Sequence, residues 1–329
     1  MPGRENLASS RPRELVQRGI AVKSDRFVPE ARCLLCGAPG RLPLTPFGTR
    51  WDGRQFDYLD CTACWSRFMH PVPSSQDFER IYTRCGYHEV HYRELASGQF
   101  SRSLRMLAKF AAPGTRLLDF GCGNGEFLKE ATAAGYVAEG VELDVETCRS
   151  AAANSGCPVT SLSQARRNMG RYDAIHLGDV LEHLPDPAGT MHDLEALLTS
   201  TGLFLVEGPL EENRSLVAFT AAVVRRLKAA TRRPNYAHEP PTHLTRTSAR
   251  SQRRFFEESA GYRLCNFEVY ESGWPYAAPW RDIFPPKSGS IAIRGLIAKA
   301  ATGIARASNI ASLAVGDRFI AVLRPIRGE

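Results

Sequence analysis

Glycine occupies every second position after an acidic residue in the middle of the chain: Asp119 is followed by Gly121, Gly123 and Gly125. An apolar run precedes this turn and a helix-like pattern follows it. Glycine has no Cβ, so it adopts positive φ easily and lets a ligand lie against the main chain. The turn lacks the spacing of a dinucleotide site and the Lys of a phosphate loop. A carboxylate ahead of it would repel phosphate, so we expect a cationic or hydroxylated ligand group here.

A second acid, Glu142, ends the next expected strand. It lies about 20 residues after the turn, where a carboxylate that binds ribose hydroxyls is expected. A carboxylate suits this role because it can accept charge-assisted hydrogen bonds from two neighbouring hydroxyls. We therefore predict that Glu142 binds ribose, with Asp144 as the reserve.

The third pattern is YDAIHLGDVLEHLPDP at residues 172–187. Together, the three patterns resemble the class I S-adenosylmethionine (SAM)-dependent methyltransferases, whose first motif is an acid followed by G-x-G-x-G. The resemblance implies that the turn lies against the methionine and ribose of SAM. It also implies that Leu143, Gly178 and Asp179 lie beside the cofactor and that His183 lies at the mouth of the substrate pocket. A packing or helix-capping role for His183 stays open.

Four of the nine cysteines form two C-x-x-C pairs, Cys33 with Cys36 and Cys61 with Cys64. Two such pairs can place four thiolates tetrahedrally around a structural Zn²⁺ ion. The surrounding segment is rich in turn residues and could hardly fold on a core of its own. A redox role is the alternative, but neither pair stands at the head of a clear strand-to-helix unit.

The second cysteine pair runs into the sequence P-V-P, ahead of the glycine turn. This order resembles a subgroup of bacterial methyltransferases in which a zinc ribbon precedes the SAM domain and which often act on sugars, cell-surface glycans or secondary metabolites. The resemblance covers roughly residues 30–325. It implies methyl transfer to a small-molecule or sugar acceptor, which could carry phosphate, and we expect O-methylation with histidine assistance. A sugar C-methyltransferase is the alternative.

Histidines are the candidates for the general base, because an ordinary histidine pKa of about 6.5 leaves the neutral form available near pH 7. His243, in a P-x-H-L segment that resembles one in the family, is the first candidate and His183 the second. Glu239 and His238 follow. Some sugar C-methyltransferases carry a tighter H-E-H triplet near this place, whereas three residues separate Glu239 from His243 here.

Apolar runs and helix-like segments alternate along the rest of the chain. This alternation predicts an α/β, Rossmann-like fold: a seven-stranded, mainly parallel sheet with helices on both faces, preceded by a small zinc-ribbon domain. Ligands bind beyond the carboxyl ends of such strands, where the three motifs would meet. The expected strands are 115–120, 136–142, 158–162, 172–178, 202–207, 262–270 and 317–324, and the expected helices are 98–112, 125–134, 145–155, 187–199 and 290–313.

We expect four units along the chain. They are a flexible N-terminal tail (1–29), the zinc ribbon (30–75), linker or lid helices (76–112), and the methyltransferase domain (113–329) with a substrate-pocket insertion at about 209–245. The small residues in the helical stretch at 290–313 would allow close packing, on the sheet by default or in a homodimer, so the protein is expected to be a monomer or a homodimer.

The net charge of +7 leaves other functions open. Basic residues could form a phosphate-binding face, as in a zinc-ribbon RNA methyltransferase, but the chain lacks an aromatic-rich RNA-binding motif, so we do not expect a nucleic-acid partner. A third possible class is a non-enzymatic binding protein with the fold of the SAM-dependent enzymes. The intact glycine turn and Glu142 argue against this class. The sequence shows no apolar run of the roughly 18 residues that a membrane span needs and no signal peptide, so we expect a cytoplasmic protein.

Overall fold

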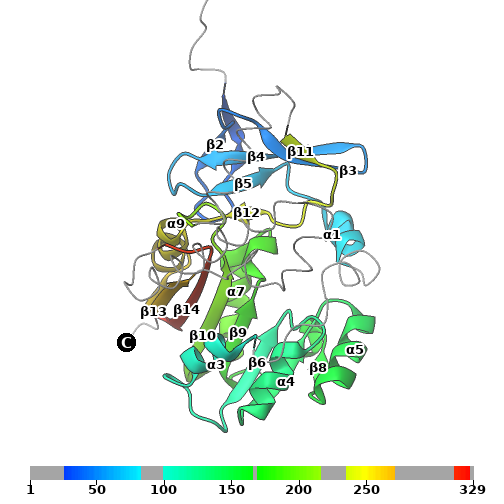
Figure 1. Cartoon of the computed structure of the whole chain (residues 1–329), viewed down its shortest axis with the longest axis vertical. Coiled ribbons are helices and arrows are strands. Elements are labelled where there is room, and N and C mark those ends of the chain that lie inside the picture. Colours follow the sequence, from blue (N-terminus) through cyan, green and yellow to red (C-terminus); the bar gives the residue numbers. More distant parts are fainter. Residues whose placement is uncertain (1–25, 83–98, 166–168, 216–234, 271–314, 327–329) are drawn as a thin grey trace, which may run out of the picture.

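The computed structural model describes residues 26–82, 99–165, 169–215, 235–270 and 315–326 (Figure 1). The predicted helical stretch at 290–313, most of the predicted tail and much of the linker and the insertion lie outside these ranges. The described residues form two sheets with helices around the larger one. Among them, no helix has the length and apolar character needed to span a bilayer.

The larger sheet has seven strands in the order β13-β14-β10-β9-β6-β7-β8. The five strands from β10 to β8 are parallel, whereas β14 runs antiparallel to both of its neighbours. This confirms the predicted seven-stranded, mainly parallel architecture. The strands are β6 (Arg116–Phe120), β7 (Val137–Val141), β8 (Val159–Thr160), β9 (Tyr172–Gly178), β10 (Leu198–Pro209), β13 (Tyr262–Tyr270) and β14 (Arg318–Pro325).

Helices cover both faces of this sheet because successive strand residues point to opposite sides. Leu117 belongs to a buried cluster with α3 and α4, whereas its neighbour Leu118 belongs to a second cluster with α7 and α9. The helices are α3 (Ser101–Leu107), α4 (Glu126–Ala133), α5 (Val145–Ser155), α6 (Leu162–Ala165), α7 (Pro187–Glu195) and α9 (Ala249–Arg254), with the short helices η2 (Leu181–His183) and η3 (Phe255–Ser259).

Two helices differ in length from the prediction. Helix α3 is shorter at both ends than the predicted 98–112, and α7 ends at Glu195 rather than at 199. The chain enters β10 at Leu198, which pairs with Tyr172 of β9. The following Thr199, Ser200 and Thr201 are weak helix formers, so pairing in the sheet prevails over one more helical turn.

The smaller sheet contains the two cysteine pairs, and we call it the ribbon sheet. Its strands are β1 (Phe27–Arg32), β2 (Pro39–Arg41), β3 (Phe47–Trp51), β4 (Arg54–Cys61), β5 (Arg67–His70), β11 (Asn235–Ala237) and β12 (Thr245–Arg246), and helix α1 (Ser75–Ile81) follows β5. Strands β11 and β12 come from the segment predicted as a substrate-pocket insertion, and they pair with β3 and β5. β12 therefore lies between the ribbon strands and the larger sheet (Figure 1). We retain the predicted domain limits as a proposal, with these two strands added to the ribbon.

Candidate functional site

The glycine turn joins β6 to α4 in left-handed backbone conformations. The φ angles are 75° at Gly121, 54° at Gly123 and 84° at Gly125, a region that favours glycine. Space is restricted as well. A Cβ on Gly121 would lie 2.8 Å from a methyl group of Val180, and a Cβ on Gly125 would lie 2.8 Å from the carbonyl oxygen of Ala151. Both the backbone conformation and the packing therefore require glycine at these two positions.

Glu142 lies against this turn, as its spacing predicts. Its buried carboxylate accepts hydrogen bonds from the backbone N–H of Gly123 at 2.9 Å and of Leu143 at 2.7 Å. Burial raises the pKa of Glu142, and the two N–H donors oppose that effect. Asp144, the second candidate for binding ribose, instead caps helix α5 by accepting a hydrogen bond from the N–H of Thr147. Glu142 is thus the acid with a hydrogen bond to the glycine turn at Gly123.

The surface beside Glu142 is unexpectedly apolar. Leu143 is 67% exposed and Val145 is 60% exposed, although both are large hydrophobic side chains. An exposed apolar pair next to a glycine turn can pack against a flat ring of a ligand. Leu143 thus presents an exposed apolar side chain next to Glu142.

Asp119 faces a buried ionic group that the sequence did not reveal. Its Oδ1 lies 2.7 Å from Nδ1 of His176, whose Nε2 lies 3.0 Å from Glu207. The hydroxyl of Ser103 donates to both oxygens of Glu207 at 2.8 Å, and the ring of Phe127 stacks on His176. Burial lowers the pKa of His176, but the Asp119 and Glu207 carboxylates outweigh it and raise the pKa to about 9. His176 is thus an imidazolium held between two carboxylates.

This ionic group explains one of the predicted cofactor positions. A Cβ on Gly178 would lie 2.7 Å from the imidazole carbon Cε1 of His176, so glycine is needed there whatever the ligand does. The next residue, Asp179, has φ of 53° and accepts a hydrogen bond from the guanidinium of Arg318 at 2.8 Å. Asp179 remains half exposed at the carboxyl end of β9. It could therefore face a ligand, but its carboxylate is already paired.

A second polar cluster lies next to the glycine turn. It consists of Glu182 and His183 in η2, and His243 just before β12. Each offers one ligand atom, and these atoms lie within 4.8 Å of one another, so they could share a proton or hold a cation. The backbone N–H of Leu244 donates to the carbonyl of Glu182 at 2.6 Å, which holds the two segments together.

Two members of this cluster have unusual proton affinities. Burial lowers the pKa of His243, but a contact of 3.2 Å between its Nδ1 and Glu211 outweighs it and raises the pKa to about 9. Burial and the negative charge of Asp179 raise the pKa of Glu182 to about 8. Near pH 7, His243 therefore carries a proton and a positive charge, and Glu182 is mostly neutral.

The proton of His183 can be placed from its neighbours. Its Nδ1 lies 2.9 Å from the carbonyl oxygen of Thr242, which can only accept, and 2.9 Å from the hydroxyl of Tyr82. Nδ1 therefore carries the proton, and in neutral His183 Nε2 is the basic atom. This Nε2 lies 3.8 Å from Glu182.

The structure separates the four predicted base candidates into two groups. The rings of His183 and His243 meet edge to face, with centroids 4.8 Å apart. His238 and Glu239 are exposed, and neither forms a hydrogen bond or ion pair with another residue in the described ranges. Sequence reasoning named the two histidines but not Glu182 or Glu211, although Glu182 directly precedes His183.

The four predicted metal ligands converge. The Sγ atoms of Cys33, Cys36, Cys61 and Cys64 lie within 4.8 Å of one another, with Cys33 and Cys64 3.7 Å apart and Cys36 and Cys61 3.5 Å apart. Tetrahedral zinc with Zn–S bonds of about 2.3 Å requires sulfur atoms about 3.8 Å apart. The cluster therefore fits zinc in both chemistry and spacing.

The ribbon sheet also fixes the backbone around His243. The hydroxyl of Tyr58 in β4 donates to the carbonyl of His243 at 2.6 Å, and the N–H of Met69 in β5 donates to the carbonyl of Leu244 at 2.8 Å. Phe68 then pairs with Thr245 in the sheet register. The cluster that contains His243 is thus built by both sheets.

Comparisons with known proteins agree with these features. A methyltransferase domain model matches residues 90–265, which is more than half of the chain. A ubiquinone biosynthesis O-methyltransferase from Xanthomonas campestris is 30% identical over 183 residues, covering 53% of this chain and 72% of that protein. The protein of the same name from Vibrio campbellii is 28% identical over 119 residues, covering 34% of this chain, and the match spans 49% of that relative's length.

Among solved structures, a phosphoethanolamine N-methyltransferase 2 from Haemonchus contortus aligns with a TM-score of 0.45 at 16% identity, covering 79% of this chain and 62% of that one. Structural similarity at this level does not indicate which acceptor molecule this chain methylates. The match to the domain model and the similarity to the Xanthomonas protein together show to which family this chain belongs. This chain belongs to the family of SAM-dependent methyltransferases.

Proposed function

We propose that this chain transfers the methyl group of SAM to a hydroxyl oxygen of a small-molecule acceptor such as a sugar or a natural product. One observation carries the proposal: Val180 contacts the glycine turn at Gly121, and Glu182 and His183 follow it within one turn of chain. The polar cluster is therefore next to the residues that fit the cofactor. The names of the Xanthomonas and Vibrio relatives favour oxygen as the acceptor atom.

The residues that would hold SAM each meet one of its chemical features. The main chain of the glycine turn admits close approach, the carboxylate of Glu142 suits the ribose hydroxyls, and exposed Leu143 suits the adenine ring. Bound SAM supplies a methyl group that its sulfonium has already activated. Much of the work left to the protein is then to align the acceptor and remove its proton.

His183 is the better candidate for the proton acceptor. His243 is protonated near pH 7 because of Glu211, so it cannot take a proton in that state. His183 holds its proton on Nδ1 and presents Nε2 as a base. The positive charge of His243 can instead orient the acceptor oxygen and stabilise the oxyanion that develops as the proton leaves.

A direct test is methyl transfer from ¹³C-methyl SAM to a panel of phenols, sugars and nucleotide-linked sugars. NMR of the products distinguishes a methoxy carbon from a methyl group bound to carbon. Methoxy products support the proposal, whereas C-methyl products would identify the sugar C-methyltransferase alternative. The matched control is Glu142→Gln, which is expected to lower transfer to every acceptor because it weakens cofactor binding.

A further inference from the structure

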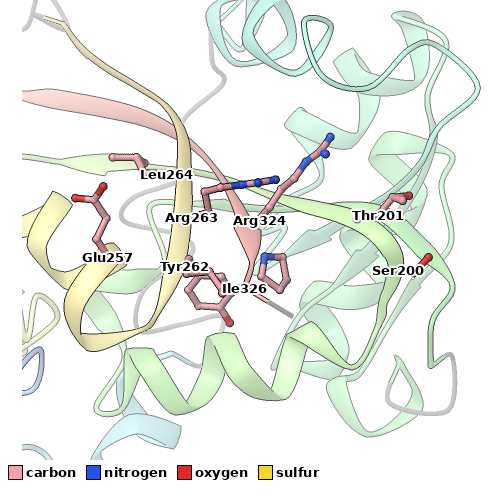
Figure 2. A pocket seen from close by; sticks show the side chains of 10 residues that line it. Ser200, Thr201, Glu257, Tyr262, Arg263, Leu264, Arg324 and Ile326 are labelled. Carbon is pink, nitrogen blue, oxygen red and sulfur yellow. The ribbon is translucent and has the colours of Figure 1, made fainter. Parts of the chain in front are cut away.

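A groove of about 640 Å³ lies on the larger sheet, away from the glycine turn (Figure 2). It is lined by residues of η3, the start of β10, the start of β13 and the end of β14, among them Ser200, Thr201, Glu257, Arg263 and Arg324. The glycine turn lies at the carboxyl end of β6, whereas Ser200 lies near the amino end of the parallel strand β10. The groove is therefore at the opposite edge of the sheet from the proposed methyl-transfer site.

Two arginine side chains lie next to each other on neighbouring strands in this groove. Arg263 of β13 is directly paired with Arg324 of β14 in the antiparallel register, so the two side chains lie on the same face. Figure 2 shows the two arginine side chains next to each other. Like charges directly opposite each other destabilise an antiparallel pair. The sheet therefore carries an unfavourable contact that an internal carboxylate or a bound anion would relieve.

No internal carboxylate relieves it among the residues that the structure describes. Neither guanidinium lies within 4.0 Å of a carboxylate there, although Glu257 of η3 lines the groove. The Nε atom of Arg324 is buried without a hydrogen-bond partner. Because this atom is closed off from solvent, a ligand in the groove would be held by the terminal N–H groups of the two guanidinium groups. What the arginine pair lacks in the described residues is thus a negatively charged group that accepts hydrogen bonds.

The groups on offer match a phosphate. Guanidinium groups bind phosphate oxygens through parallel N–H donors, and the hydroxyls of Ser200 and Thr201 add neutral donors on the β10 side. The volume lies within the range of small-molecule sites. We propose that this groove binds a soluble, phosphate-bearing small molecule through Arg263 and Arg324, at a site separate from methyl transfer.

The test measures binding of inorganic phosphate and pyrophosphate by calorimetry and by thermal shift, in phosphate-free buffer of constant ionic strength. The wild type should bind at least one of them saturably and gain stability. Arg324→Gln and Arg263→Gln should each weaken that binding at least tenfold. The control, Arg105→Gln, removes the same charge from an exposed helix position and should bind as the wild type does.

A second readout separates binding from folding. Without phosphate, Arg324→Gln should be at least as stable as the wild type, because it removes one of two opposed charges. Affinity for S-adenosylhomocysteine, the demethylated product of SAM, should stay the same in all variants. The proposal is overturned if the wild type shows no saturable response, if Arg324→Gln binds as tightly as Arg105→Gln, or if Arg324→Gln is less stable than the wild type in phosphate-free buffer.

Discussion

His176 offers the sharpest test of the electrostatics at the centre of the sheet. The change is His176→Gln, which keeps a polar side chain but removes the positive charge between Asp119 and Glu207. In the folded chain the pKa of His176 is raised to about 9 from its ordinary 6.5. At 1.36 kcal/mol for each pH unit, this difference corresponds to about 3 kcal/mol of stability. The imidazole is fully buried, so solvent screening does not reduce this figure much.

The sign of the pH dependence follows from the raised pKa. A histidine that binds its proton more tightly in the fold stabilises the folded state in full below pH 6.5, and this stabilisation is lost as the pH rises through 9. In His176→Gln, the two buried carboxylates lose the cation between them, which costs about 3 to 5 kcal/mol at pH 6.5. The gap between wild type and variant should therefore shrink as the pH approaches 10.

The assay is urea unfolding of both proteins, reduced and zinc-replete, at several pH values from 6 to 10. Other groups titrate in this range, among them His243 and Glu182, and the difference between the two proteins removes the part of their contribution that does not depend on residue 176. The matched control is His192→Gln, because His192 bonds to a backbone carbonyl at Ala260 and to no carboxylate in the described part of the chain. A gap that stays constant with pH would refute the imidazolium assignment.

Three further outcomes are expected. Glu142→Gln should lower the affinity for S-adenosylhomocysteine about 10- to 100-fold by calorimetry, since a hydrogen bond to a charged group contributes about 1.5 to 3 kcal/mol; unchanged affinity would exclude Glu142 from ribose binding. His243→Ala should lower turnover far more than SAM affinity, and equal turnover in variant and wild type would remove His243 from catalysis. Cys64→Ser should lose bound zinc by mass spectrometry and lower turnover, while S-adenosylhomocysteine affinity changes less than threefold; retained zinc would show that Cys64 is not a ligand.

Much of the larger sheet could be predicted from the sequence because its strands are apolar runs bounded by glycine or charged residues. The predicted strand at 172–178 coincides with β9, and the one at 262–270 coincides with β13. The link between Glu142 and the glycine turn was also predictable, since both follow neighbouring parallel strands, whose carboxyl ends meet at one edge.

The pairings between distant side chains could not be predicted. His176 sits inside an apolar strand, and nothing in its neighbours shows that Asp119 and Glu207, on the two adjacent strands, point toward the same ring. That alignment depends on the register of three strands, which the sequence does not state. The same holds for Arg318, which reaches Asp179 only because β14 returns beside β10.

Strand β12 was not predicted, for a different reason. Among the elements that were missed, this strand matters most for the proposed function. It lies outside the alternation of strands and helices that predicted the equally short β8, and with two residues it is too short for a periodicity. Its partner is the ribbon, and the neighbouring Leu244 is fully buried in a small core with Phe56, Tyr58 and Met69.

This core is small, although Leu59 and Phe68 of the ribbon also pack into the large buried cluster of the other sheet, so we propose that the metal supplies part of the ribbon's stability. Loss of zinc would free the strand that holds Leu244, and His243 would move with it. Because the glycine turn and Glu142 lie on the other sheet, cofactor binding would survive. Zinc would then control the position of a histidine in the acceptor site without contacting the acceptor.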